Sequence, residues 1–120
     1  YAHQYHLPGT YSATATFSLL RKAVDEAEKL EHPYVVGNVL CSDLFYNETP
    51  EWKEWAKMGV LAAEMESYAL YCNAARAGVN ALAIFTVSDS IVNGEEMSAE
   101  ERQIGFRNMM EVALGVANQL

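Results

Sequence analysis

The sequence predicts an α/β fold in which helices flank a mixed, largely parallel sheet. Three short apolar stretches each run into acidic or polar residues, and segments with helical spacing lie between them. Strands that alternate with helices along a chain are typical of parallel sheets. The three stretches are residues 35–43 (VVGNVLCSD), 59–66 (GVLAAEME) and 81–89 (ALAIFTVSD).

The first helix and the first strand follow a polar, turn-rich opening at residues 1–15. Thr16 is the expected N-cap of the helix, and Pro33 lies just beyond its end. Apolar residues recur at helical spacing between them, namely Phe17, Leu20, Val24, Ala27 and Leu30. Residues 34–41 are short and rich in β-forming residues, which predicts a buried strand.

The middle of the chain predicts helix, strand, helix and strand in turn. Thr49-Pro50-Glu51 is a helix start, with a capping hydroxyl, a proline at the first helical position and an acid in the first turn. Gly59 ends this helix, and residues 60–63 form the second strand. Residues 66–77 then form a helix closed by Gly78, and residues 81–87 form the third strand.

The last helix opens with a capping box made by Ser98 and Glu101. We expect one apolar stripe along it to be buried. The stripe comprises Phe106, Met109, Ala113, Val116 and Leu120. Strands this apolar need cover on both faces and neighbours at the sheet edges. We therefore expect residues 1–120 to be one portion of a single domain that is incomplete at its amino-terminal side.

Composition and charge narrow the function. The 120 residues are 51% apolar and 20% charged, as in ordinary folded proteins, and carry a net charge of −8. That acidic balance argues against nucleic acid or an anionic membrane as the main partner. Cys41 and Cys72 lack metal-ligand spacing and are expected to be reduced thiols. Reduced thiols are typical of a cytoplasmic protein, which we therefore expect. We expect no metal site, because His3 and His6 have no third ligand nearby.

Carboxylates at the ends of the predicted strands mark the candidate site. In open α/β sheets, ligands bind outside the carboxyl ends of the strands. We expect the acidic side chains there to converge on one rim and to serve an enzyme that acts on a small polar molecule. They are Asp43, Glu64, Glu66 and Asp89.

Glu64 and Glu66 flank Met65 at the junction between the second strand and the following helix. If this junction is extended, both carboxylates point the same way and suit paired hydroxyls, as on a ribose. Met65 would then lie against the sugar face. An equally favoured alternative is a solvated helix start, where acids interact with the helix dipole.

Asp89 follows a fully apolar predicted strand. Partial burial would raise the pKa of Asp89 and suit it to general acid catalysis, with Arg102 folding back on it from the next helix. On spacing alone, a turn cap for Asp89 and a surface ion pair for Arg102 are the favoured alternatives. Phe45 and Tyr46 either stack on a planar base or plug the sheet edge.

Motifs in register along the chain resemble one family. They are SDLFY (42–46), AEMES (63–67), TVSDS (86–90) and AEERQIGFRNMM (99–110). In order and spacing they resemble the carboxyl-terminal half of the bacterial-type hexameric purine nucleoside phosphorylases, within the nucleoside phosphorylase/nucleosidase superfamily. The resemblance implies a phosphorylase/hydrolase-like fold, a cytoplasmic homohexamer built as a trimer of dimers, and no cofactor.

The resemblance further implies a glycosyltransferase of purine salvage. Such an enzyme catalyses reversible phosphorolysis, in which a purine (deoxy)nucleoside and inorganic phosphate give the free base and (deoxy)ribose 1-phosphate. By this resemblance Asp89 protonates the purine at N7 with help from Arg102. Glu66 holds the ribose hydroxyls, and Met65 packs beneath the sugar. The remaining implied substrate-binding residues are Phe45, near the base, and Ala63, Glu64 and Ser88.

The chain departs from the family pattern in several places. Ala63 stands where valine is usual, and Ser90 stands where histidine is common. In the family the phosphate site, a glycine loop with arginines, belongs to the amino-terminal half, and no arginine here matches it. We therefore expect the base and ribose side of the site alone, and little phosphorolysis by the isolated chain. The alternatives are a uridine phosphorylase, a methylthioadenosine/S-adenosylhomocysteine-type nucleosidase, and a non-catalytic fragment or assembly module.

Overall fold

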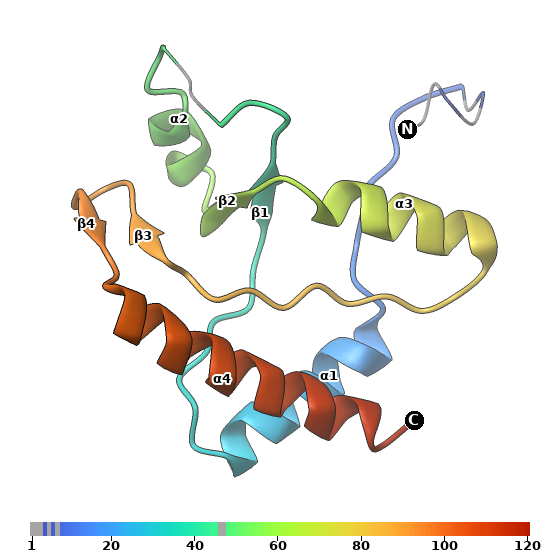
Figure 1. The fold of residues 1–120 in the computed structure, drawn as a ribbon. Helices are drawn as coiled ribbons and strands as arrows, with labels where there is room; N and C mark the ends of the chain where they lie inside the picture. The colour runs from blue at the N-terminus through green and yellow to red at the C-terminus, as the bar shows by residue number, and fades with distance from the viewer. Residues whose placement is uncertain (1–3, 5, 7, 46–47) are drawn as a thin grey trace. The chain divides into compact units, whose positions relative to one another are not determined.

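The computed structural model describes residues 4, 6, 8–45 and 48–120, and the chain divides into two compact units. Figure 1 shows the helices and strands of both units. Among the residues described, no helix is both long enough and apolar enough to cross a lipid bilayer. The first unit is drawn from Tyr1–Thr16 and Val35–Ala81, and the second from Phe17–Tyr34 and Leu82–Leu120.

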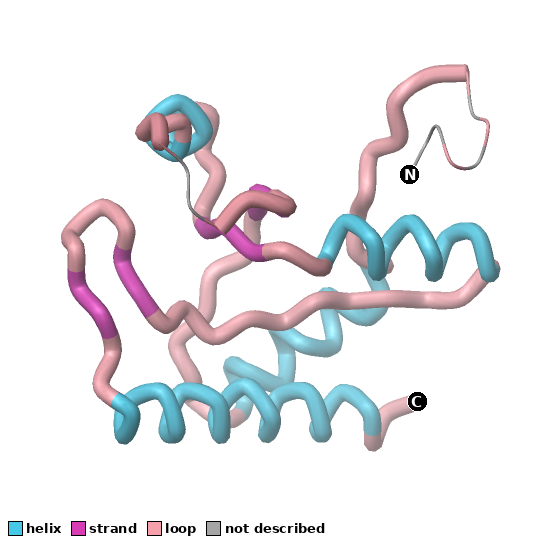
Figure 2. Tube along the Cα trace, turned by 45° about the horizontal axis from the view of Figure 1, so that its top comes forward, coloured by secondary structure: helices cyan, strands magenta, loops and turns pink. Residues whose placement is uncertain are grey.

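Two short parallel strands form the sheet of the first unit. They are β1 (Val39–Cys41) and β2 (Ala62–Glu64), and α2 (Trp52–Lys57) lies between them along the chain, as Figure 2 shows. The register pairs Val39 with Ala62, Leu40 with Ala63 and Cys41 with Glu64. The predicted order of parallel strand, helix and parallel strand is confirmed here.

The first strand is shorter than the sequence predicts. Val35 and Val36 precede β1 and are exposed, whereas the prediction placed them in a buried strand. Ladder hydrogen bonds require a partner, and β2 offers one over three residues alone. β2 also begins two residues later than predicted and ends at Glu64.

Glycines end the helices of the first unit, as predicted. Gly59 follows α2 with φ of 79° and Gly78 follows α3 (Ser67–Ala77) with φ of 69°, a left-handed conformation that glycine adopts without steric cost. The N–H groups of Gly78 and Val79 donate to carbonyls in the last turn of α3. These caps fix where each helix stops.

Two helices form the core of the second unit, α1 (Phe17–Lys29) and α4 (Ala99–Ala117). Small side chains at their contact let the two helices approach closely. The buried residues of this core are Ala23, Ala27, Val112 and Val116. Glu26 is also buried there, and Gly115 leaves room for it because any β-carbon at position 115 would clash with the Glu26 side chain. Gln119 Nε2 donates to Glu26 Oε2 at 3.2 Å.

The predicted buried stripe on α4 was partly wrong. Val116 is buried and Met109 is half-buried, but Phe106 is 43% exposed, and Ala113 and Leu120 are also exposed. The face that contacts α1 runs through Val112 and Val116 instead. α4 carries apolar residues around most of its circumference, so periodicity alone did not select the buried face.

The first helix begins where it was predicted to begin, but the surroundings of its start differ from the prediction. Phe17 begins α1 but is exposed rather than buried. Thr16, the expected N-cap, uses its hydroxyl oxygen to accept the N–H of Ala81 at 3.0 Å, and its own N–H donates to the Ala81 carbonyl at 2.8 Å. These reciprocal bonds lie within the first unit.

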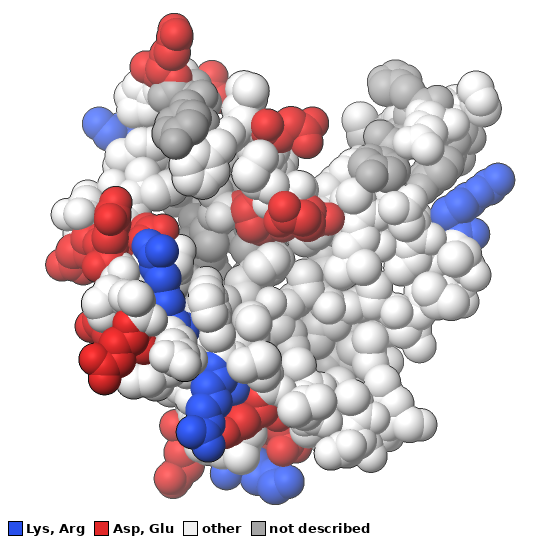
Figure 3. All heavy atoms as spheres, in the orientation of Figure 1, with Lys and Arg blue, Asp and Glu red and all other residues white. Residues whose placement is uncertain are grey.

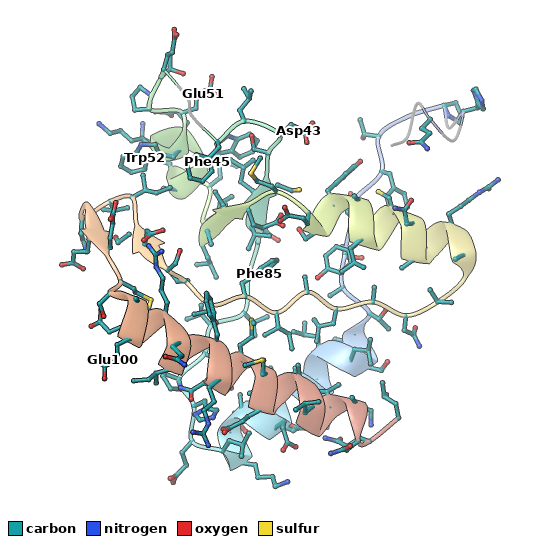
Figure 4. All side chains as sticks on the ribbon, viewed as in Figure 1. Asp43, Phe45, Glu51, Trp52, Phe85 and Glu100 are labelled. Carbon is teal, nitrogen blue, oxygen red and sulfur yellow. The ribbon has the colours of Figure 1, made fainter. Side chains whose placement is uncertain are left out.

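The third predicted strand, residues 81–87, is not a strand in the structure. In the second unit the segment packs on the helices by its side chains: Ile84 lies against the core, and the hydroxyl of Thr86 donates to the Gly105 carbonyl at 3.1 Å. Phe85 and Val87 are exposed, and Figure 4 shows Phe85 pointing away from α4. Side-chain packing therefore replaces the expected ladder.

A short antiparallel hairpin follows this segment. It consists of β3 (Asp89–Ser90) and β4 (Glu95–Glu96), with Asp89 opposite Glu96. The Met97 N–H donates to the Ser88 carbonyl at 2.9 Å and continues the pairing. The fold is thus mixed α/β with a small parallel sheet, which confirms the predicted class, while the three-stranded parallel sheet is not observed.

Candidate active site

Glu64, the last residue of β2, anchors the turn into α3. Its Oε2 accepts the N–H groups of Glu66 at 2.8 Å and Ser67 at 2.7 Å, and its Oε1 accepts the Ser67 hydroxyl at 2.5 Å. The thiol of Cys41, its partner on β1, also hydrogen bonds to this carboxylate. Burial disfavours the charged form, but these donors outweigh it, so the pKa of Glu64 lies below its ordinary value.

Glu66 has a different environment, although it is two residues further along the chain. Its side chain is exposed and has no hydrogen-bond or ion-pair partner among the residues that the structure describes. Residues 65 and 66 form a bend, so the extended junction that would align the carboxylates of Glu64 and Glu66 is absent. Figure 3 shows the junction of β2 and α3 as an acidic patch. Glu66 is the carboxylate of this pair that remains open to a ligand.

Other predicted residues of the first unit are accessible. Ala63 and Met65, on either side of Glu64 along the chain, are exposed, Met65 by 38%. Phe45 is 76% exposed in the loop between β1 and α2, where Figure 4 labels it, so its ring does not plug the sheet edge. Asp43 is exposed in the same loop, and Tyr46 lies outside the described residues.

Asp89, in the second unit, has a hydrogen-bond donor at each carboxylate oxygen. Arg102 Nη2 donates to Oδ1 at 3.0 Å, and the Ser88 hydroxyl donates to Oδ2 at 2.7 Å. The predicted approach of Arg102 to Asp89 across thirteen residues is therefore confirmed. Both side chains remain partly exposed, Arg102 by 41% and Asp89 by 45%.

The pKa of Asp89 moves in the opposite direction to the prediction. Partial burial was expected to raise it. In the structure the Ser88 hydroxyl, together with the Arg102 guanidinium, outweighs burial and lowers the pKa of Asp89 below its ordinary value. Asp89 is thus held as a carboxylate at neutral pH.

The first turn of α4 places Arg102. The Ser98 hydroxyl accepts the Glu101 N–H at 3.1 Å, and the Glu101 carboxylate accepts the Ser98 N–H at 2.8 Å, which confirms the predicted capping box. The Nε of Arg102 is buried and has no hydrogen-bond partner in the described part of the chain. The guanidinium therefore keeps an unused donor beside Asp89.

Metal ligation finds no support in the described ranges, where no three His, Cys, Asp or Glu side chains gather around a common point. Of the two histidines considered as metal ligands, His6 is described by the structure and His3 lies outside the described ranges. Cys72 is buried and Cys41 is half-buried, and both are unbridged thiols.

The predicted site residues divide between the two units. Ser88, Asp89 and Arg102 come together in the second unit, and Ala63 to Glu66 form a continuous segment of the first. The sequence reading missed Ser67 and Cys41, which complete the environment of Glu64. A serine at a helix start, three residues after a glutamate, was the available signal.

Comparison with known proteins places this arrangement in a family. The family described as the phosphorylase superfamily matches residues 1–119 of the chain. The chain belongs to the phosphorylase superfamily. That membership fits the α/β fold and the carboxylates at the strand ends.

Curated members of the superfamily narrow the comparison. The chain is 55% identical over 108 residues to a protein of Thermoanaerobacter sp. (strain X514), 54% identical over 108 residues to one of Caldanaerobacter subterraneus subsp. tengcongensis, and 51% identical over 107 residues to one of Geobacillus kaustophilus. Each is named purine nucleoside phosphorylase DeoD-type. Each alignment covers 89% of this chain and 45% to 47% of the relative, so the chain spans about half the length of these relatives.

Proposed function

We propose that the protein acts in the reversible phosphorolysis of purine (deoxy)nucleosides, and that this chain supplies the groups that handle the base and the ribose. The observation that carries the proposal is the Asp89 carboxylate held by Arg102 and Ser88 at 3.0 and 2.7 Å. A purine has a ring nitrogen, N7, that can receive a proton as the base departs, whereas a pyrimidine has no N7. The names of the relatives support the same substrate class.

In the proposed reaction the bond between the sugar C1′ and the purine N9 breaks, and its electron pair moves into the base. Asp89 delivers a proton to N7, so the base leaves as a neutral molecule rather than an anion. A phosphate oxygen forms the new bond to C1′ and gives (deoxy)ribose 1-phosphate. Because Arg102 and Ser88 hold Asp89 ionised at rest, Asp89 takes up a proton from water before it donates one to N7. The phosphate releases its own proton to water as its bond to C1′ forms, so the protons balance.

Glu66 and Met65 are proposed to bind the sugar. A carboxylate without other partners can accept both hydroxyls of a ribose diol, and the Glu66 side chain is exposed and unpartnered among the described residues. The exposed thioether of Met65 offers an apolar surface for the sugar face. Phe45, exposed in its loop, is proposed to stack near the base.

Further parts of the proposal concern the rest of the enzyme. Inorganic phosphate is the proposed co-substrate, no cofactor is required by the chemistry above, and a cytoplasmic homohexamer is the proposed assembly. No phosphate role is assigned to Arg102, which pairs with Asp89, or to Arg107, which pairs with Glu111 at 3.1 Å. We accordingly expect the chain on its own to bind nucleoside but to turn it over poorly.

A substrate panel tests this proposal. The purified chain is incubated with inosine, uridine or methylthioadenosine, with and without phosphate, and binding and base release are both measured. We expect purine nucleoside binding, no uridine binding and little base release by the chain alone. Preference for uridine, or phosphate-independent release from methylthioadenosine, would favour the other superfamily reactions. Robust phosphorolysis by the chain alone would show that the chain does contain residues that bind phosphate.

A further inference from the structure

We infer that Glu64 does not bind the substrate itself but, with Ser67 and Cys41, positions Glu66 for the ribose. The inference rests on the proposed function, in which Glu66 holds the sugar hydroxyls. It reassigns Glu64, which the family resemblance placed among the pocket residues.

The Glu64 carboxylate has little capacity left to accept further hydrogen bonds. A carboxylate offers about four lone-pair positions. In the structure its donors are the N–H of Glu66, the N–H and the hydroxyl of Ser67, and the thiol of Cys41. Ser67 is 5% exposed, so these partners are enclosed and do not exchange readily with solvent. A sugar hydroxyl would have to displace one of them.

The hydrogen bonds to Glu64 fix the backbone around Glu66. Glu64 Oε2 binds the backbone N–H of Glu66 at 2.8 Å and that of Ser67 at 2.7 Å. The peptide on either side of the Glu66 α-carbon is therefore fixed, while the Glu66 side chain stays exposed. A bend that carries a binding carboxylate keeps its direction through the residue that anchors its backbone.

The small parallel sheet also supports this bend. Cys41 and Glu64 are paired in the parallel register of β1 and β2, so the thiol contact ties the bend to the neighbouring strand. Glu64, Ser67 and Cys41 thus form a rigid support, and Glu66 is the exposed group that it presents. Glu64 and Ser67 are positioning residues in this view, and Glu66 alone meets the sugar.

The test measures how strongly the protein prefers a nucleoside with ribose hydroxyls. Calorimetric titration gives the Kd of inosine and of 2′,3′-dideoxyinosine for the purified protein, and their ratio reports the hydroxyl contacts. We expect Glu66→Ala to abolish the preference. We expect Glu64→Gln to reduce it about tenfold, the size of a lost hydrogen bond to a charged group, with the Kd of dideoxyinosine unchanged. In the double variant, Glu64→Gln should add nothing to Glu66→Ala.

The outcomes separate the two proposals. If Glu64→Gln lowers the preference further in the Glu66→Ala background, Glu64 touches the ribose and the inference is overturned. If Glu64→Gln weakens both ligands equally, its role is general stability, and the inference is again overturned. If Glu66→Ala leaves the preference intact, the proposed role of Glu66 fails instead. Ser67→Ala serves as the second route should Glu64→Gln not fold, with the same reduced preference expected.

Discussion

Glu66 in the first unit and Asp89 in the second are both carboxylates that follow apolar segments, but their resting states are opposite. Glu66 is exposed and without a partner in the described chain, whereas Asp89 has a donor at each oxygen. A group that accepts ligand hydroxyls works best with its oxygens vacant. A group that exchanges a proton needs neighbours that control its charge. The two environments therefore match two different tasks.

Replacing the proposed acid gives the largest expected effect. In an active form of the protein, one that includes a phosphate site, Asp89→Asn should lower kcat for inosine phosphorolysis by about 10²- to 10⁴-fold, because an amide cannot deliver a proton to N7. Steady-state assay of base release measures it. Glu95→Gln, on the facing strand of the same hairpin, is the matched control and should stay within about twofold. A variant at Asp89 with near-normal kcat would remove the acid from the mechanism.

Arg102→Gln sharpens the comparison through pH. Arg102 lowers the pKa of Asp89, so its loss should raise that pKa and keep Asp89 protonated to higher pH. The alkaline limb of the kcat/KM profile should move to higher pH, and kcat should fall by about tenfold as the assisting donor is lost. Arg107→Gln, on the same helix, is the matched control, because it removes a guanidinium that pairs with Glu111 instead of Asp89. An unmoved limb would show that Arg102 does not govern the charge of Asp89.

The buried contact between α1 and α4 in the second unit can be tested by measuring the free energy of unfolding. Val112→Ala removes two methyl groups from the buried contact of α1 and α4 and should lower the free energy of unfolding by about 2 kcal/mol. Leu114→Ala, on the same helix but 65% exposed, should cost less than about 0.5 kcal/mol. Urea titration measures both. The reverse order would mean that the buried face of α4 has been assigned to the wrong side.

The smallest expected effect concerns Glu64 in the first unit and how its contribution to stability changes with pH. The folded pKa of Glu64 lies below the ordinary 4.5, so Glu64 stabilises the fold above that pH and loses this contribution as pH falls through the folded pKa. Glu64→Gln should destabilise by on the order of 1 kcal/mol at pH 7, with the difference from wild type vanishing in acid. Urea titrations at neutral and acidic pH measure it, with Glu66→Gln as the indifferent control. A difference that persists unchanged in acid would contradict the assigned charge.

Local signals in the sequence were sufficient for some features. The Ser98 and Glu101 capping box and the Gly78 helix end depend on residues a few positions apart, and both were predicted correctly. Features that depend on a distant partner were harder. The strand expected at residues 81–87 needed a neighbouring strand to form its ladder, and no local pattern states which partner is present.

The candidate site divides in the same way. The contact between Asp89 and Arg102 was predicted from the sequence, but the direction of the Asp89 pKa shift depends on the Ser88 hydroxyl and on the folded position of Arg102. The different environments of Glu64 and Glu66 depend on a bend rather than on an extended junction. Adjacent carboxylates look alike in a sequence, and the backbone donors that separate them become visible only in three dimensions.

Gly105 carries a consequence for the spacing of the acid and its cation. Thr86 bonds to the carbonyl of Gly105, and a β-carbon at position 105 would collide with the Thr86 methyl group. Asp89 lies three residues after Thr86, and Arg102 lies three residues before Gly105. The contact of Thr86 with Gly105 therefore holds the segment that leads to Asp89 against the helix that carries Arg102. An alanine at position 105 would press on the Thr86 side chain, so a residue that bears no chemistry of its own constrains the contact between Asp89 and Arg102.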